Sequence, residues 1–369
     1  YIYNKSMQRY TLCVLLVFCV CTAGAQPLAA AFKNAARTLP GKTVSAEALG
    51  RRAAQLLAER SAPAAFAAAR KQCLQLVAAE DKQIYCPADV PPAFSLRNKL
   101  LTQARRELLE KNWQLFLQRP QAAQALYSPH INYADIIPSS ARLIFLGEIH
   151  GQNTIHQEIY HVIKDYRTRY PGRRIYILAE SVADDGIVYH ASNWGEKGPY
   201  QKSGAARAQM LEVLVKEQGV FLTGLERPGL VRLYNSSAAL LQAVVRKYVS
   251  ASGLEIRNRG FLEKIASLRR LDPQAVFFVY GGKAHWSYTH AGSVTLALNT
   301  GTTFVMDFIP RGWRLPSSIE SIWNTWLSTQ PAQPAGQYGV YTAADKTAAR
   351  MLGSDVKIET PKDFLLNWR

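Results

Sequence analysis

The chain has 369 residues, of which 48% are hydrophobic, 19% charged and 10% aromatic. This composition excludes a largely disordered, collagen-like or coiled-coil protein, and the length suffices for two or three domains with buried cores. The 44 Lys and Arg residues outnumber the 27 Asp and Glu residues, which gives a formal net charge of +17. We find no zinc-finger spacing or RNA-recognition signature, so we expect no nucleic acid partner. The basic surface is instead interpreted as one that meets anionic envelope polymers or lipid head groups.

Residues 1–25 have the pattern of a secretory signal peptide. Met7-Gln8-Arg9 precedes an apolar run from Leu12 to Val20, and small residues follow at Thr22-Ala23-Gly24-Ala25. The run is shorter than the roughly twenty apolar residues that a membrane span needs. We therefore predict cleavage after Ala25 and a protein that is periplasmic or secreted. An uncleaved N-terminal anchor is the alternative.

Signal cleavage would change the cysteine count. Three of the five cysteines leave with residues 1–25, and only Cys73 and Cys86 remain. An even number of cysteines in an exported chain favours a disulfide, here one that closes a short loop. Two buried free thiols are the alternative, which a thiol titration distinguishes.

Residues 26–135 are predicted to form a helical N-terminal region. Ser45 and Glu47 indicate the start of one helix, and Pro63 interrupts the helical pattern that follows. The clearest helix begins at Ser95, repeats apolar residues at helical spacing and ends at Pro120.

From residue 136 to residue 312 the pattern becomes one of apolar strands alternating with helices. Such alternation predicts an α/β fold with a mainly parallel central sheet flanked by helices, to which the helical N-terminal region is added. Residues 313–369, which are rich in Trp, Pro and Gln, are expected to form a tail that wraps this core. The predicted strands are 143–146, 175–179, 220–223, 275–280 and 303–306.

Polar residues follow four of these strands directly. In parallel sheets the carboxyl ends of the strands meet at one edge, where ligands bind. We therefore expect Glu148, His150, Glu180 and His285 to converge there, with side-chain ends no farther apart than about 12 Å, a span that one bound ion or substrate can bridge. The strand-end motifs are Gly147-Glu148-Ile149-His150-Gly151, Glu180-Ser181, Glu226-Arg227 and Gly281-Gly282-Lys283-Ala284-His285.

Two of these motifs share the spacing Gly-x-x-His. One copy is a weak signal, but two copies at strand ends together with a strand-end Glu favour a functional cluster. Imidazole and carboxylate groups suit a divalent metal, for which His150, Glu180 and His285 are the candidate ligands. They equally suit a metal-free site in which a carboxylate orients a His that activates water.

The ordered motifs between residues 140 and 310 resemble those of the ChaN-like haem-binding proteins. These belong to a superfamily with the Tiki/TraB proteins and the erythromycin esterases. Residues 152–153 are Gln-Asn, where the ChaN pattern commonly has an acidic residue, and no Tyr- and Trp-rich haem region is evident. The segments that match are Ile144–Gly151 with His156, Ala179-Glu180-Ser181, Glu255–Arg259, and Val279–His285 with Gly292.

The resemblance implies roles for particular residues. It gives His150 and His285 as paired imidazoles and Glu148 and Glu180 as carboxylates. Arg257 would be the cation that stabilises an anion, with Arg259 as the alternative two positions on. Independently of the resemblance, a helix that starts at the first motif points its first turn at the site, so His156 is the candidate cofactor contact. His161, His190 and His290 are expected to lie outside the site.

The resemblance leaves several functions open. The first hypothesis is an exported hydrolase that acts on a small-molecule or peptide substrate, with water activated by the His/Glu cluster and possible help from a divalent metal. The second is a ChaN-like envelope protein that binds haem or iron without turnover, and the third is a secreted toxin or effector. For His285→Ala we expect loss of function with little loss of stability, because strand-end loops make few core contacts.

Overall fold

The central sheet of the computed structural model has eight strands in the order β1-β7-β8-β6-β2-β5-β3-β4. Strands β8, β6, β2, β5, β3 and β4 are parallel to one another, and β7 pairs antiparallel with β8 and β1. The α/β fold with a mainly parallel sheet is thereby confirmed. The strands are β1 (Ala123–Ser128), β2 (Leu143–Glu148), β3 (Ile175–Ala183), β4 (Val220–Glu226), β5 (Val276–Gly282), β6 (Thr303–Pro310), β7 (Tyr338–Ala343) and β8 (Val356–Thr360).

The structure describes residues 92–361, except 120, 151–152, 196–197, 203, 237–244, 247, 299–300, 312–321, 323–325 and 328. The predicted signal peptide, the earlier helical patterns, Cys73 and Cys86 lie outside these residues. What the sequence predicts for these residues is therefore not tested by the structure and stays a prediction.

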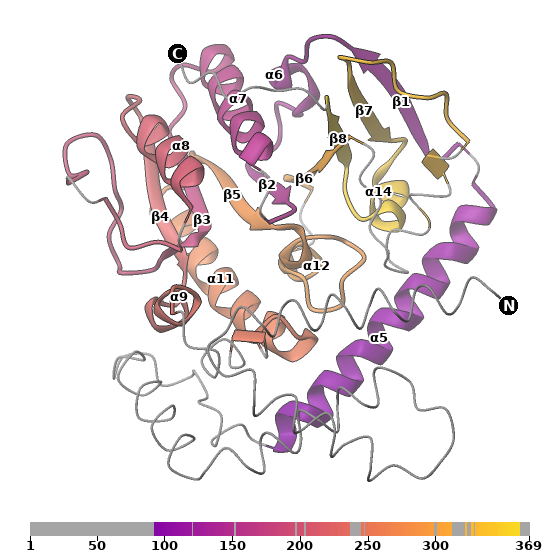
Figure 1. Ribbon diagram of the computed structural model, residues 1–369, viewed down its shortest axis with the longest axis horizontal. Coiled ribbons are helices and arrows are strands. Elements are labelled where there is room, and N and C mark those ends of the chain that lie inside the picture. The colour runs from indigo at the N-terminus through magenta and orange to yellow at the C-terminus, as the bar shows by residue number, and fades with distance from the viewer. Residues whose placement is uncertain are drawn as a thin grey trace, which may run out of the picture. The chain divides into compact units, whose positions relative to one another are not determined.

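Helices cover both faces of the sheet (Figure 1). One face packs its apolar side chains against α7 (Asn153–Arg169) and α8 (Ala205–Val215). The opposite face packs against α11 (Ala251–Leu271). Because β2 and β5 lie between two apolar layers, every residue of both strands is buried. This explains why their sequences are continuous apolar runs rather than alternating patterns.

The remaining helices are short, apart from one. The clearest predicted helix is present as α5 (Pro92–Leu117), which contacts α11 and α14. The short helices are α6 (Tyr133–Ile136), α9 (Pro228–Tyr234), η1 (Lys283–His285), α12 (Val294–Leu298) and α14 (Lys346–Leu352).

The sheet extends beyond the five predicted strands at one edge. Strand β1 lies within the region 26–135 that the sequence predicts to be helical, and β7, α14 and β8 lie within the segment 313–369 expected to wrap the core. Helix α14 has well-formed ends, since Asp345 caps its first turn through Ala348 N–H and Gly353 ends it with a φ of 98°. The segment after residue 313 thus supplies part of the sheet itself.

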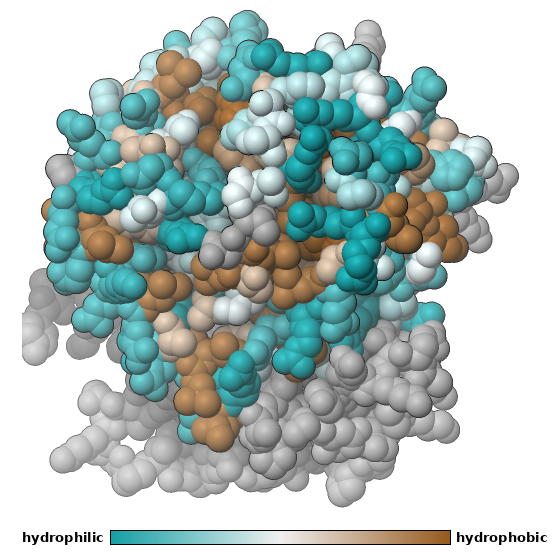
Figure 2. All heavy atoms as spheres, turned by 180° about the vertical axis from the view of Figure 1, so that it is seen from behind, coloured by the Kyte–Doolittle hydropathy of each residue, from teal (hydrophilic) through white to brown (hydrophobic). Residues whose placement is uncertain are grey.

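The surface mixes polar and apolar side chains. Figure 2 shows hydrophilic groups over most of one face, with apolar side chains gathered between them. Among the residues that the structure describes, no helix is long and apolar enough to cross a membrane.

Candidate functional site

The predicted strand-end residues meet at one edge of the sheet. Glu148 ends β2, Glu180 lies near the end of β3, and His285 lies in η1 directly after β5. The His150 Nδ1 atom lies 2.8 Å from Glu148 Oε1, and its Nε2 atom lies 3.8 Å from Glu180 Oε2. The His285 Nε2 atom lies 3.5 Å from Glu180 Oε1. The structure therefore brings the four residues together in consecutive contacts.

These residues line a pocket of about 560 Å³. It is bounded by the ends of β2, β3 and β5 together with parts of α8, α9 and α11. The lining residues are Glu148, Ile149, His150, Glu180, Ser181, Lys202, Arg207, Tyr234, Asn235, Val249, Leu254, Arg257, Tyr280, Gly281, Gly282, Lys283, Ala284 and His285.

Two glycines at the end of β5 make room for the site. A Cβ atom on Gly282 would lie 2.7 Å from His150 Nε2, and one on Gly281 would lie 2.6 Å from Glu180 Oε2. Both distances are too short for real contacts. The backbone N–H of Gly282 also donates to Glu180 Oε2 over 2.7 Å. The glycines thus let an imidazole and a carboxylate approach the strand closely.

His150 is held by a buried carboxylate yet remains accessible. Its side chain is 60% exposed, whereas that of Glu148 is 2% exposed. Since a carboxylate only accepts hydrogen bonds, the Nδ1–H of His150 donates to it, which leaves the Nε2 lone pair at the pocket. The hydrogen bond to Glu148 is the main reason that the pKa of His150 is raised above its ordinary value.

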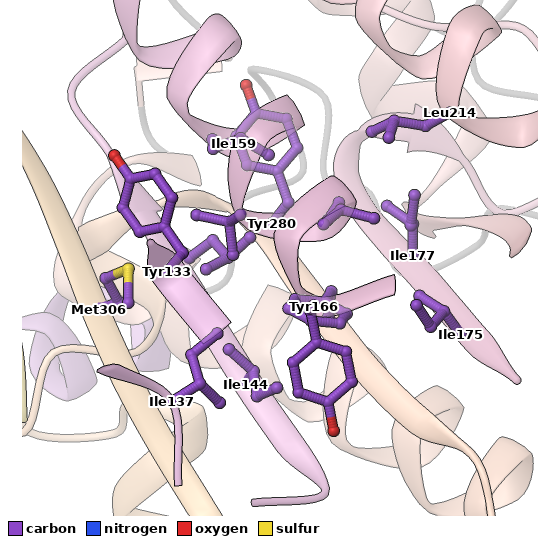
Figure 3. Close-up of a cluster of buried hydrophobic side chains, with 14 of the residues drawn as sticks. Tyr133, Ile137, Ile144, Ile159, Tyr166, Ile175, Ile177, Leu214, Tyr280 and Met306 are labelled. Atoms are coloured by element: carbon purple, nitrogen blue, oxygen red, sulfur yellow. The ribbon is translucent and has the colours of Figure 1, made fainter. Parts of the chain in front are cut away.

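The second oxygen of Glu148 is fixed by a relay behind the pocket. The Tyr280 hydroxyl donates to Glu148 Oε2 over 2.5 Å, and the Nδ1–H of His156 donates to the Tyr280 oxygen over 2.7 Å. In Figure 3 the Tyr280 hydroxyl points away from the cluster of apolar side chains around its ring. Burial tends to raise the pKa of Glu148, but the hydrogen bond from His150 and the charge of Arg207 lower it below its ordinary value.

His156 therefore lies behind the carboxylate and does not line the pocket. Burial lowers its pKa to about 4, so it is neutral at pH 7. This position differs from the ligand-facing one that the sequence predicts, because the first turn of α7 directs the ring toward Tyr280.

Glu180 belongs to a buried ion network. Arg257 donates to Glu180 Oε1 and, through Nε, to Glu226 Oε2 over 2.9 Å. Lys202 Nζ reaches the same two carboxylates at 3.0 and 3.4 Å. Burial raises the pKa of Glu180, but the charges of Lys202 and Arg257 and the contact with His285 outweigh it and hold that pKa well below the ordinary value. Glu180 is thus a carboxylate at neutral pH.

The ion network shows which of the two candidate arginines, Arg257 or Arg259, lies at the site. Arg257 is 2% exposed and faces the carboxylates, whereas Arg259 is exposed on α11. Because its N–H groups are directed at Glu180 and Glu226, Arg257 orients these carboxylates.

His285 is more deeply packed than the sequence suggests. It is 2% exposed, its ring contacts Phe261 and Trp286, and its Nδ1–H donates to Asn258 Oδ1 over 2.5 Å. Burial, with the charge of Arg257, lowers its pKa to about 4. The expectation that His285→Ala leaves stability nearly unchanged is therefore not compatible with this packing, since the substitution leaves a cavity and an unpaired Asn258 oxygen.

The donor set does not suit a divalent metal. Within the described residues, no group of three or more His, Cys, Asp and Glu side chains has the geometry of a metal site. Glu180, the central predicted ligand, already accepts from Arg257, Lys202 and Gly282 N–H. A divalent ion bound there would lie against two positive charges.

The lining of the pocket mixes charged and apolar groups. His150 is an accessible imidazole of the kind that binds haem iron. Eight of the 18 lining residues are Asp/Glu, Lys/Arg or His, but most of the exposed lining surface is apolar. The lining therefore fits a ligand with both polar and apolar parts.

Several site residues were missed from the sequence. Lys202 lies in the loop before α8 and Arg207 in its first turn, and neither belongs to a recognisable motif. Tyr280 was interpreted as a core residue of its strand, and Asn258 was seen only as part of the Arg-bearing segment. Glu226 was found from the sequence, because it belongs to the Glu226-Arg227 motif at the end of a predicted strand. His190 and His290 do not line the pocket.

The fold and the site define an α/β protein with a pocket that contains charged side chains at the carboxyl ends of a mainly parallel sheet. No protein-family model and no curated protein matches the sequence. Similar solved structures include a Bacillus cereus protein, with 10% identity and a TM-score of 0.38 over 68% of this chain and 97% of that one. The type III effector HopBA1 has 11% identity and a TM-score of 0.34 over 66% and 99% of the two chains. ChaN of Campylobacter jejuni, described with cofacial haem binding, has 11% identity and a TM-score of 0.31 over 60% and 88%. These similarities do not establish a family.

Proposed function

We propose that the protein is an exported hydrolase that cleaves ester-type bonds of small molecules, with His150 as the base that activates water. The observation that carries this proposal is the exposed imidazole whose Nδ1–H donates to the buried Glu148 carboxylate over 2.8 Å. This is the arrangement by which a carboxylate orients a general base and stabilises its protonated form.

The chemistry assigns a role to each neighbouring group. Nε2 of His150 removes a proton from water, the water oxygen attacks the acyl carbon, and the imidazolium then returns the proton to the leaving oxygen. Glu148 at Nδ1 and Glu180 near Nε2 stabilise the imidazolium. No metal is needed for these steps.

Lys202 is the cation best placed to stabilise the developing oxyanion. Its side chain is 14% exposed at the pocket, and its ammonium group is held by Glu180 and by the ring of Tyr234, 4.1 Å away. A cation fixed in a sheltered pocket favours the charge of the transition state over that of the ground state. Arg257 acts indirectly by keeping Glu180 ionised and in place.

The test is hydrolysis of a panel of p-nitrophenyl and lactone esters by the full-length protein. We expect turnover in the wild type and a loss of about 10²–10⁴-fold in kcat/KM for His150→Ala, the usual contribution of a general base. His130→Ala is the matched control, because His130 is exposed and does not line the pocket. Turnover that survives His150→Ala would contradict the proposal.

Haem binding is the competing function, and it can be tested with the same protein preparation. Addition of haemin would give a Soret band that depends on His150 if the imidazole were an axial ligand. We expect no saturable band at one equivalent. A band lost in His150→Ala, with no esterase turnover, would favour the haem-binding function instead.

A further inference from the structure

Two buried polar groups in the pocket wall have no hydrogen-bond partner within the described part of the chain. They are Nε of Arg207 and Oγ of Ser181. The Arg207 side chain is 11% exposed, Ser181 is 6% exposed, and both residues line the pocket. Buried donors are almost always paired in folded proteins. An unpaired polar atom on a residue that lines a pocket indicates a position for a ligand group or an ordered water.

Arg207 contacts the Glu148 carboxylate and the Tyr280 hydroxyl through its guanidinium. Its Nη2 atom lies 3.7 Å from Glu148 Oε1, which fixes the guanidinium beside the Glu148–His150 pair. The Nε–H remains for another acceptor. A planar guanidinium in this position matches the geometry of a carboxylate or phosphate group.

The charges of the pocket favour the same kind of ligand. Four Lys and Arg residues line it against two carboxylates. Both carboxylates already accept donors from the protein, Glu148 from His150 and Tyr280, and Glu180 from Arg257. Arg257 and Lys202 also pair with the buried Glu226, so the four cations face three carboxylates, and the excess of one positive charge favours an incoming oxyanion.

We propose that Arg207 and Ser181 form a subsite for an oxyanion, a carboxylate or phosphate group that the substrate carries next to the bond to be cleaved. The position of that bond rests on the proposed function. The substrate class is then an ester with a neighbouring anionic group. Binding of the anion itself does not require turnover and is measured separately.

The first experiment titrates inorganic phosphate and acetate into the full-length protein by calorimetry, at ionic strength held constant with NaCl. We expect saturable binding of at least one of them, and the tighter one identifies the anionic group. Since a hydrogen bond to a charged group is involved, Arg207→Gln should weaken this binding roughly tenfold or more and Ser181→Ala severalfold. Arg207→Lys, which retains the charge without the planar guanidinium, serves if Arg207→Gln does not fold.

Lys216→Gln is the matched control. Lys216 follows α8, forms an exposed pair with Glu212 and does not line the pocket, so the variant makes the same charge change outside the subsite. It should leave the affinity within twofold of that of the wild type. Equal weakening by Lys216→Gln and Arg207→Gln would show a general charge effect and overturn the proposal.

If an ordered water, and not a ligand group, occupies the position beside Arg207 and Ser181, we expect a different result. Ser181→Ala would then leave phosphate and acetate binding unchanged, and this outcome refutes the subsite. Esterase turnover with no binding of either anion also refutes it while leaving the hydrolase function intact. Anion binding that depends on Arg207 and Ser181 without esterase turnover supports the subsite and contradicts the hydrolase function.

Discussion

Arg257→Met is expected to lower the free energy of unfolding by about 3–5 kcal/mol, the usual cost of removing one partner from a buried ion pair. Glu180 and Glu226 are 2% and 0% exposed, and Arg257 donates to both. Its loss leaves two buried carboxylates for which Lys202 is the remaining Lys or Arg contact among the described residues. Urea denaturation at pH 7, followed by tryptophan fluorescence, measures the change.

A nearby arginine provides the control for this variant. Arg259→Met changes the same residue type two positions further along α11, at an exposed position, and should alter stability by no more than about 0.5 kcal/mol. Addition of Glu226→Gln to Arg257→Met should recover part of the loss, because one of the unpaired charges is then removed. A loss below about 1 kcal/mol for Arg257→Met would show that the network is not buried as described.

The stability of the protein should also fall as the pH is lowered from 6.5 toward 4. His156 and His285 each have a pKa lowered to about 4 by burial, from an ordinary value of 6.5. Between these values the unfolded chain binds a proton that the folded chain does not. Stability therefore decreases by about 1.4 kcal/mol per pH unit for each histidine. His150, whose pKa is raised, contributes only above pH 6.5, where stability falls as the pH rises, so it does not reduce the slope in this range.

The variant His285→Gln isolates the contribution of His285 to the pH dependence of stability. Whatever its effect on absolute stability, it should reduce the slope of unfolding free energy against pH by about 1.4 kcal/mol per unit over this range. His130→Gln, at an exposed position, should leave the slope unchanged. An unchanged slope in His285→Gln would mean that His285 is already protonated in the folded protein near pH 6.

The central strands were predictable because burial on both faces leaves a continuous apolar run. Strands β2 and β5 are of this kind. Strand β8 has the sequence Val-Lys-Ile-Glu-Thr, and its Lys357 and Glu359 are buried. A short strand that buries charged residues lacks the pattern by which strands are recognised, so β8 was missed. Strands β1 and β7 contain no charged residue, but small and polar residues interrupt their apolar runs.

The site was predictable where it lies on strand ends and not elsewhere. Topology alone places Glu148, Glu180 and His285 at one edge of the sheet. The depth of His285 was not predictable, because it depends on packing against Phe261 of α11. Lys202 and Arg207 enter from the segment between β3 and β4, and only the folded chain shows that they reach the carboxylates.

The protonation state of the His150 imidazole is the most direct test of the proposed role of His150 as a base oriented by Glu148. Nitrogen chemical shifts of the full-length protein labelled with ¹⁵N-histidine, followed from pH 5 to 9 and assigned with His150→Ala, report which ring nitrogen carries the proton. We predict the Nδ1–H form with a free Nε2 lone pair, and a pKa above 6.5 that falls in Glu148→Gln because the hydrogen bond to the carboxylate is its main cause. A proton on Nε2 in the neutral ring, or a pKa that Glu148→Gln does not lower, would contradict the assignment of His150 as a base oriented by Glu148.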